Sequence, residues 1–95
     1  MDNHLHDLKK IRHDFHRHPE LGFQETRTKQ RLIEILQSLN IETHEGAGVV
    51  GVLKAGTGNR AIGLRADMDA LPITEKSTHD YVSGTSGVMH ACGHD

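Results

Sequence analysis

The chain has 95 residues, of which 35% are hydrophobic, 25% charged and only 3% aromatic. That length allows one small domain with little stability in reserve. The net charge of −2 argues against a nucleic-acid or anionic-membrane partner, because both need a basic surface. The apolar runs are too short for a membrane span or a signal peptide. A single cysteine cannot form an internal disulfide, which fits a reducing compartment and predicts a cytoplasmic protein.

Two helices are predicted in the N-terminal part of the chain. The first is amphipathic, with a stripe of residues at three- and four-residue spacing at Leu5, Leu8, Ile11, Arg12 and Phe15. It should end before Pro19, because a residue that precedes proline is disfavoured in the helical conformation. The second is predicted from about Gln24 to Leu39, with Asn40 as its terminator. Glu20 and Glu25 are placed to favour its start through the helix dipole.

From Ile41 onward the pattern becomes that of β-strands and loops. "VVGVLKA" (49–55) and "AIGLRA" (61–66) flank the turn-forming "GTGN", so they are predicted to be antiparallel neighbours. Residues 67–87 are rich in Asp, Thr, Ser and Gly and predict a long polar loop. The order indicates an α/β fold, which needs helices on both faces of its sheet. Residues 1–95 are therefore interpreted as the front part of a larger α/β domain.

Two carboxylates follow the last predicted strand, in "RADMDALP" (65–72). Loops at strand ends are where α/β proteins place their sites. Asp67 and Asp69 could bind a cation, or one of them could orient a metal-bound histidine. The alternative is an Asx-type turn with solvated carboxylates, which the spacing alone does not exclude.

The C-terminal "HACGHD" (90–95) holds the only cysteine. Thiolate and imidazole both bind zinc and similar divalent ions, and Gly93 lets the backbone bend so that Cys92 and His94 could share one ion. A single Cys-x-His pair is a weak signal, because a structural zinc site needs four protein ligands. A packed thiol beside a surface histidine is the alternative interpretation.

Nine histidines are many for so short a chain. Five lie in the first predicted helix and just after it, where polar helix faces commonly carry histidine. They are interpreted as solvated or capping side chains: His4, His6, His13, His16 and His18.

Three phrases together resemble one family: "RHDFHRHPELGFQET" (12–26), "GLRADMDALPI" (63–73) and "GVMHACGHD" (87–95). The chain resembles the N-terminal part of the metal-dependent amidohydrolases that include hippurate hydrolase, N-acyl-amino-acid deacylases and indole-acetyl-amino-acid hydrolases, relatives of aminoacylase and glutamate carboxypeptidase. The resemblance spans essentially the whole chain and implies an incomplete α/β/α zinc-peptidase-like catalytic domain.

The resemblance also implies roles for individual residues. Cys92 and His94 match metal ligands of the family, and the cysteine stands where related peptidases use a bridging aspartate. Asp69 matches an aspartate of the catalytic site that orients a metal-ligating histidine. Asp67 stands where related peptidases have a histidine ligand, and it is not assigned as a ligand. The helix-pair signature is interpreted as structural.

The implied chemistry is amide hydrolysis of N-acyl amino acids or similar small amides, with water activated by two divalent metal ions. Zinc or manganese is expected, with cobalt or nickel as alternatives. The resemblance further implies a homodimer or another homo-oligomer.

Other elements of that family site lie beyond the GHD motif: the general-base glutamate pair, the remaining ligands and the lid or dimerisation domain. Residues 1–95 alone are therefore expected to be inactive and of marginal stability. The alternative is a truncated, non-catalytic chain that at most binds a metal weakly. A stand-alone structural zinc module is disfavoured because no second Cys/His pair is present.

Overall fold

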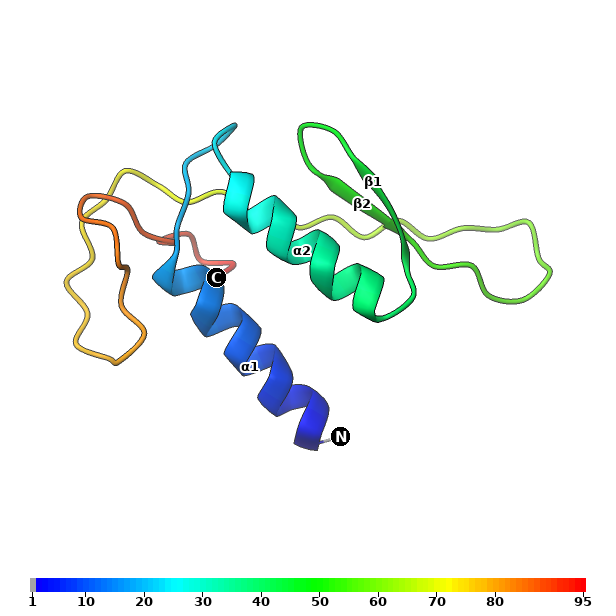
Figure 1. The fold of residues 1–95 in the computed structure, drawn as a ribbon, viewed down its shortest axis with the longest axis horizontal. Coiled ribbons are helices and arrows are strands. Elements are labelled where there is room, and N and C mark those ends of the chain that lie inside the picture. Colours follow the sequence, from blue (N-terminus) through cyan, green and yellow to red (C-terminus); the bar gives the residue numbers. More distant parts are fainter. Residues whose placement is uncertain (1) are drawn as a thin grey trace.

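The computed structural model describes residues 2–95 as two helices, one hairpin and long connecting loops (Figure 1). Helix α1 spans Asp2–Arg17 and helix α2 spans Thr26–Ser38, so both predicted helices are confirmed. Helix α1 ends before Pro19, as expected from the backbone restriction that proline imposes. Neither helix of the described residues combines the length and the apolar character needed to cross a membrane.

The start of α2 is held by a carboxylate from the preceding loop. Glu20 accepts hydrogen bonds from the backbone N–H groups of Arg27 and Thr28, at 3.0 and 2.6 Å. Burial raises the pKa of Glu20, but these donors outweigh it and the net pKa is lowered. The prediction that Glu20 supports the start of the helix is confirmed. Glu25 is the N-cap residue, but its side chain makes no capping hydrogen bond and instead accepts the N–H of Phe23.

The end of α2 is a Schellman motif built on Asn40. The φ angle of Asn40 is 59°, in the left-handed region that asparagine tolerates better than most residues. Its N–H donates to the carbonyl of Gln37, and the N–H of Ile41 donates to that of Leu36, both at 3.0 Å. Asn40 therefore terminates the helix, as predicted.

The hairpin lies one segment earlier in the chain than predicted. Strand β1, Glu42–Glu45, pairs antiparallel with β2, Val49–Val52, in a register that places Glu42 opposite Val52. Helix α2 packs on this hairpin. A Cβ atom on Gly51 would lie 3.3 Å from Ile41 and 3.4 Å from Leu36, so the missing side chain permits the close approach.

The predicted pairing of residues 49–55 with 61–66 is wrong. Within residues 2–95 the sheet has two strands, β1 and β2, and 61–66 is an extended segment with no strand beside it. Its Ile62 and Leu64 are 91% and 96% exposed. The β propensity of this segment is real, but propensity forms a strand only where a neighbour supplies hydrogen bonds and packing.

The molecule exposes more surface than a compact protein of its mass. Its accessible surface is 7548 Å², against roughly 5,400 Å² expected from the size scaling of folded monomers. Its radius of gyration is 15.1 Å, against about 12 Å expected. Only one hydrophobic residue among those described, Ala70, is fully buried. These values support the expected marginal stability.

Residues 67–87 form the long polar loop that the sequence predicted, and together with the C-terminal residues they fold back along the end of α1 (Figure 1). Leu71 and Met89 form an antiparallel bridge, with N–H to O distances of 2.9 and 3.0 Å. The N–H of Gly84 donates to the carbonyl of Arg17 at 2.8 Å, which satisfies one of the last carbonyls of α1.

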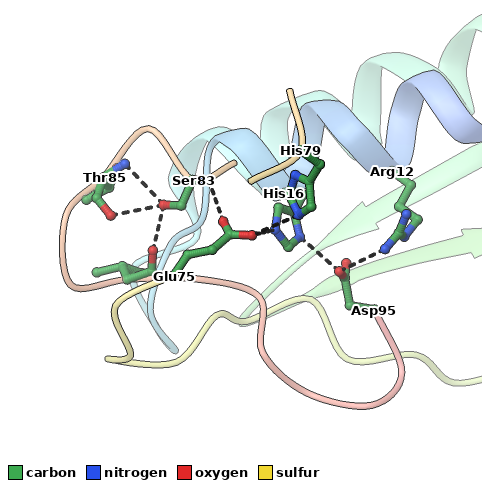
Figure 2. A network of polar contacts seen from close by, with 8 residues as sticks. Arg12, His16, Glu75, His79, Ser83, Thr85 and Asp95 are labelled. Carbon is green, nitrogen blue, oxygen red and sulfur yellow. Dashed lines mark hydrogen bonds and ion pairs between the residues drawn. The ribbon is translucent and has the colours of Figure 1, made fainter. Parts of the chain in front are cut away.

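A buried histidine joins this C-terminal segment to α1 (Figure 2). The His16 side chain is 5% exposed, and its two ring nitrogens face Glu75 Oε2 and Asp95 Oδ2, each at 2.9 Å. The second Glu75 oxygen accepts the N–H of Ser83 at 2.6 Å. Because carboxylates only accept, the ring makes both contacts together when both of its nitrogens carry a proton. We call this set of contacts, with Arg12 on Asp95, the His16 clamp.

The clamp changes the acidity of Glu75. Burial raises the pKa of this carboxyl, but the His16 side chain and the Ser83 N–H stabilise the charged form and lower the pKa to about 2. The Glu75 side chain is 4% exposed, so these contacts are shielded from solvent.

We expect Glu20→Gln to destabilise the fold by about 1 kcal/mol, because an amide is a weaker acceptor for the first N–H groups of α2. Urea titrations followed by circular dichroism measure the change. Glu34→Gln is the matched control, since Glu34 is half-exposed on α2 and its polar partners are the side chains of Arg31 and Gln30, not the first N–H groups of the helix. Equal losses in the two variants would contradict the capping role.

We expect the wild-type chain to lose stability more steeply than Glu75→Gln as the pH falls. The folded pKa of Glu75 lies below the unfolded value of about 4.3, so its contribution is present above pH 4.3 and disappears towards pH 2. Urea midpoints measured between pH 5 and pH 2 test this. Parallel pH profiles for the two proteins would show that the clamp does not stabilise the charged carboxylate.

Candidate functional site

Cys92 and His94 lie in one tight turn at the end of the described chain. The N–H of Asp95 donates to the carbonyl of Cys92 at 3.1 Å, which closes the turn through Gly93 and His94. The thiol of Cys92 is free and exposed, and His94 is exposed as well. Exposure removes the packed-thiol alternative for Cys92 and leaves both side chains open to an external ligand.

A groove of about 490 Å³ opens beside this turn. His94 and Asp95 line it from the turn, and Asp67 and His90 line it from the neighbouring segments. Its apolar walls come mainly from α1 and α2, through Leu8, Ile11, Phe15 and Leu32. The groove therefore combines apolar walls with a few polar groups, which is the usual composition of a small-molecule site.

Thr28 of α2 is one buried polar residue of the groove, and His90 is another. His90 is 8% exposed, and its Nε2 atom is buried without a hydrogen-bond partner. Burial lowers its pKa, which favours the neutral imidazole, although the carboxylate of Asp95 acts in the opposite direction. A buried imidazole nitrogen without a partner is unusual and marks a position where a ligand or an ordered water would complete the bonding.

The two aspartates of "RADMDALP" have different surroundings. Asp67 lines the groove and forms an ion pair with Arg65 at 2.8 Å. Asp69 is half-buried and faces the loop between the helices, where a Cβ atom on Gly22 would lie 3.7 Å from its Oδ2. Among residues 2–95, no hydrogen bond or ion pair joins the side chain of Asp69 to Cys92 or His94. The role of Asp69 therefore stays a prediction.

The structure brings together a second group of polar side chains that the sequence analysis missed. Ligand atoms of His16, Glu75 and His79 lie within 4.8 Å of one another, a spacing that could hold a metal ion. His79 also stacks on Tyr81, with ring centroids 3.8 Å apart, and His13 stacks on the same tyrosine at 3.7 Å.

The interpretation of His16 as a solvated or capping residue is wrong, because it is 4% exposed. His13 is also half-buried against Tyr81, whereas His4, His6 and His18 are exposed as predicted. A usable signal was present, since His16 follows Arg12 by four residues and so shares the helix face that the apolar stripe defines. Its partners, Glu75 and Asp95, are far away in the sequence, so no pattern near His16 could predict them.

The donors around the groove fit a divalent metal ion chemically. The groove lining offers imidazole nitrogens and carboxylate oxygens, and Cys92, on the same turn as His94, adds an exposed thiol; zinc and similar ions accept this mixture. The Nε2 atom of His90 has no hydrogen-bond partner, and within the described residues the side chains of Cys92 and His94 make no hydrogen bond, whereas the Asp95 carboxylate is already bonded to His16 and Arg12.

Comparison with known proteins identifies the family. The family model described as Peptidase family M20/M25/M40 matches residues 63–95. The chain is 49% identical to the hippurate hydrolase of Campylobacter jejuni over 92 residues, covering 94% of this chain and 24% of that protein. It is 46% identical over 92 residues to the N-acyl-L-amino acid amidohydrolase of Geobacillus stearothermophilus, covering 94% and 25%.

Solved structures show the same similarity. The YXEP protein of Bacillus subtilis, described as a dinuclear metal-binding peptidase of the M20 family, superposes with a TM-score of 0.87 at 38% identity, covering 93% of this chain and 26% of that one. A structure from methicillin-resistant Staphylococcus aureus gives 0.83 at 38% identity, covering 90% and 24%. The predicted fold class, an incomplete α/β domain, is confirmed. The chain spans about a quarter of the length of these proteins. It belongs to peptidase family M20/M25/M40 and corresponds to the N-terminal part of its amidohydrolase members.

Proposed function

We propose that the chain forms part of a metal-dependent amidohydrolase that cleaves N-acyl amino acids or similar small amides. The observation that carries the proposal is the exposed Cys92–His94 pair beside a groove with apolar walls, in a chain so similar to hippurate and N-acyl-amino-acid hydrolases. The groove would receive the acyl group on its apolar walls, and the polar groups would face the amide.

We assign Cys92 and His94 as ligands of a two-metal site, with zinc or manganese as the expected ions and cobalt or nickel as alternatives. Bound metal would polarise the amide carbonyl and make a nearby water more acidic. A thiolate ligand would add negative charge and make the site sensitive to oxidation. Asp69 would act from outside the ligand set, by orienting an imidazole or tuning its basicity. A cytoplasmic location and a homo-oligomeric state belong to the same proposal.

In the whole protein that contains this chain, we expect Cys92→Ala or His94→Ala to abolish most hydrolysis of hippurate and to lower the bound metal. Elemental analysis and a hydrolysis assay measure the two effects. His44→Ala is the matched control, because the His44 side chain is 62% exposed on the hairpin and its hydrogen bond is to Glu42, away from the turn. Unchanged metal content and turnover in both ligand variants would refute the ligand assignment.

The second candidate is that residues 1–95 by themselves are non-catalytic. Within these residues the proposed site has two ligands and one outer aspartate, and no glutamate lines the groove that could serve as general base. We expect the 95-residue chain with added zinc or manganese to hydrolyse hippurate no faster than the metal alone. Metal-dependent turnover that is lost in Cys92→Ala would contradict this expectation.

A further inference from the structure

The turn that carries Cys92 and His94 is anchored through its last residue. Asp95 closes the turn with its backbone N–H, and its carboxylate accepts from His16 Nδ1 at 2.9 Å and from Arg12 Nη2 at 3.3 Å. This carboxylate is 17% exposed, although the turn around it is open to solvent. One side chain therefore connects an otherwise exposed turn to the body of the molecule.

The group that holds Asp95 is itself fixed. Arg12 and His16 are four residues apart on α1, so they point to the same side of the helix. The second nitrogen of His16 is held by Glu75, and Glu75 is held in turn by the Ser83 N–H and by His79 Nε2 at 3.1 Å. Figure 2 shows this continuous series of contacts from the 75–85 loop through α1 to Asp95.

The His16, Glu75 and His79 group is better explained as this support than as a metal site. The two N···O distances to Glu75, 2.9 and 3.1 Å, are hydrogen-bond lengths. The shorter of these two distances belongs to His16 Nε2, and the other ring nitrogen of His16 already contacts the carboxylate of Asp95.

We infer that Asp95, His16 and Arg12 are positioning residues that hold the Cys92–Asp95 turn in the conformation that presents Cys92 and His94 to a metal ion. The inference rests on the proposed ligand role of Cys92 and His94. Ordering a backbone residue costs conformational entropy, and Gly93 makes this turn especially free in the absence of an anchor. An anchor supplied by side chains of α1 lowers the entropy that this turn has left to lose when metal binds.

Cobalt(II) alone is a suitable probe of the metal affinity of the 95-residue chain, because a Cys92–cobalt bond produces a thiolate-to-metal charge-transfer absorption. We expect Asp95→Ala to weaken cobalt binding on the order of 10-fold, the size typical for partners that orient metal ligands. Asp95→Asn, which keeps an acceptor, should recover part of the affinity. His18→Ala is the matched control, since His18 lies just beyond α1 and contacts Asp14 instead of the turn.

A nitroxide spin label on the only cysteine reports the turn without metal. We expect restricted label motion at Cys92 in the wild-type chain and in His18→Ala. In Asp95→Ala and Arg12→Gln the label should become mobile, while circular dichroism shows unchanged helix content. Arg12→Gln guards against a folding artefact, because the Arg12 side chain is 45% exposed and glutamine keeps a long polar side chain at this position.

The outcomes separate the two proposals. A label that is equally mobile in all variants, or cobalt affinity that Asp95→Ala leaves unchanged, overturns the positioning role while the ligand assignment stands. If the wild-type chain shows no charge-transfer absorption, Cys92 does not ligate cobalt in this chain, and the label spectra alone then decide whether the clamp orders the turn. Mobile labels in Asp95→Ala and Arg12→Gln with weakened cobalt binding support the inference.

Discussion

The contact on which the C-terminal part of this molecule depends is the buried imidazole of His16 between two carboxylates. Residues 67–95 contain no helix or strand, so regular backbone hydrogen bonding does not hold them together. They are ordered by a few long-range contacts, chiefly the bridge between Leu71 and Met89 and the pair of His16 contacts to Glu75 and Asp95. A polar contact of this kind is strong only because it is buried, where solvent does not screen it.

The small apolar core explains why the order of the C-terminal part depends so strongly on the His16 contacts. The chain exposes far more area than its mass requires, and the side chains of Ile62 and Leu64 are almost entirely open. An apolar core therefore contributes little, and polar contacts carry an unusually large share of the organisation. Relatives about four times as long have additional chain with which such an extended, β-prone segment can pair.

Local signals in the sequence were sufficient for the helices and insufficient for the sheet. Pro19, Glu20 and Asn40 act on backbone groups within eight residues of themselves, so their effects can be predicted from the chain alone. The choice of strand partner depends on which segments meet in space. The turn-forming "GTGN" favoured one hairpin, whereas the two residues Ile41 and Leu36 packing against Gly51 stabilise the earlier one.

For the candidate site as well, local features could be predicted from the sequence, whereas the long-range contacts could not. The pattern of Cys92 and His94 left a metal-ligand pair and a packed thiol both open, and the ligand roles came from the family resemblance; the structure adds that both side chains are exposed in a closed turn. The sequence could not show that a helix residue about eighty positions earlier holds this turn: the place of His16 on the face of the apolar stripe indicates burial, but nothing local names Asp95 as its partner. Its burial and its two acidic partners distinguish it. A histidine-rich helix beside a metal-ligand motif therefore needs to be judged by its tertiary contacts: the residue that supports the site need not be one that binds the metal.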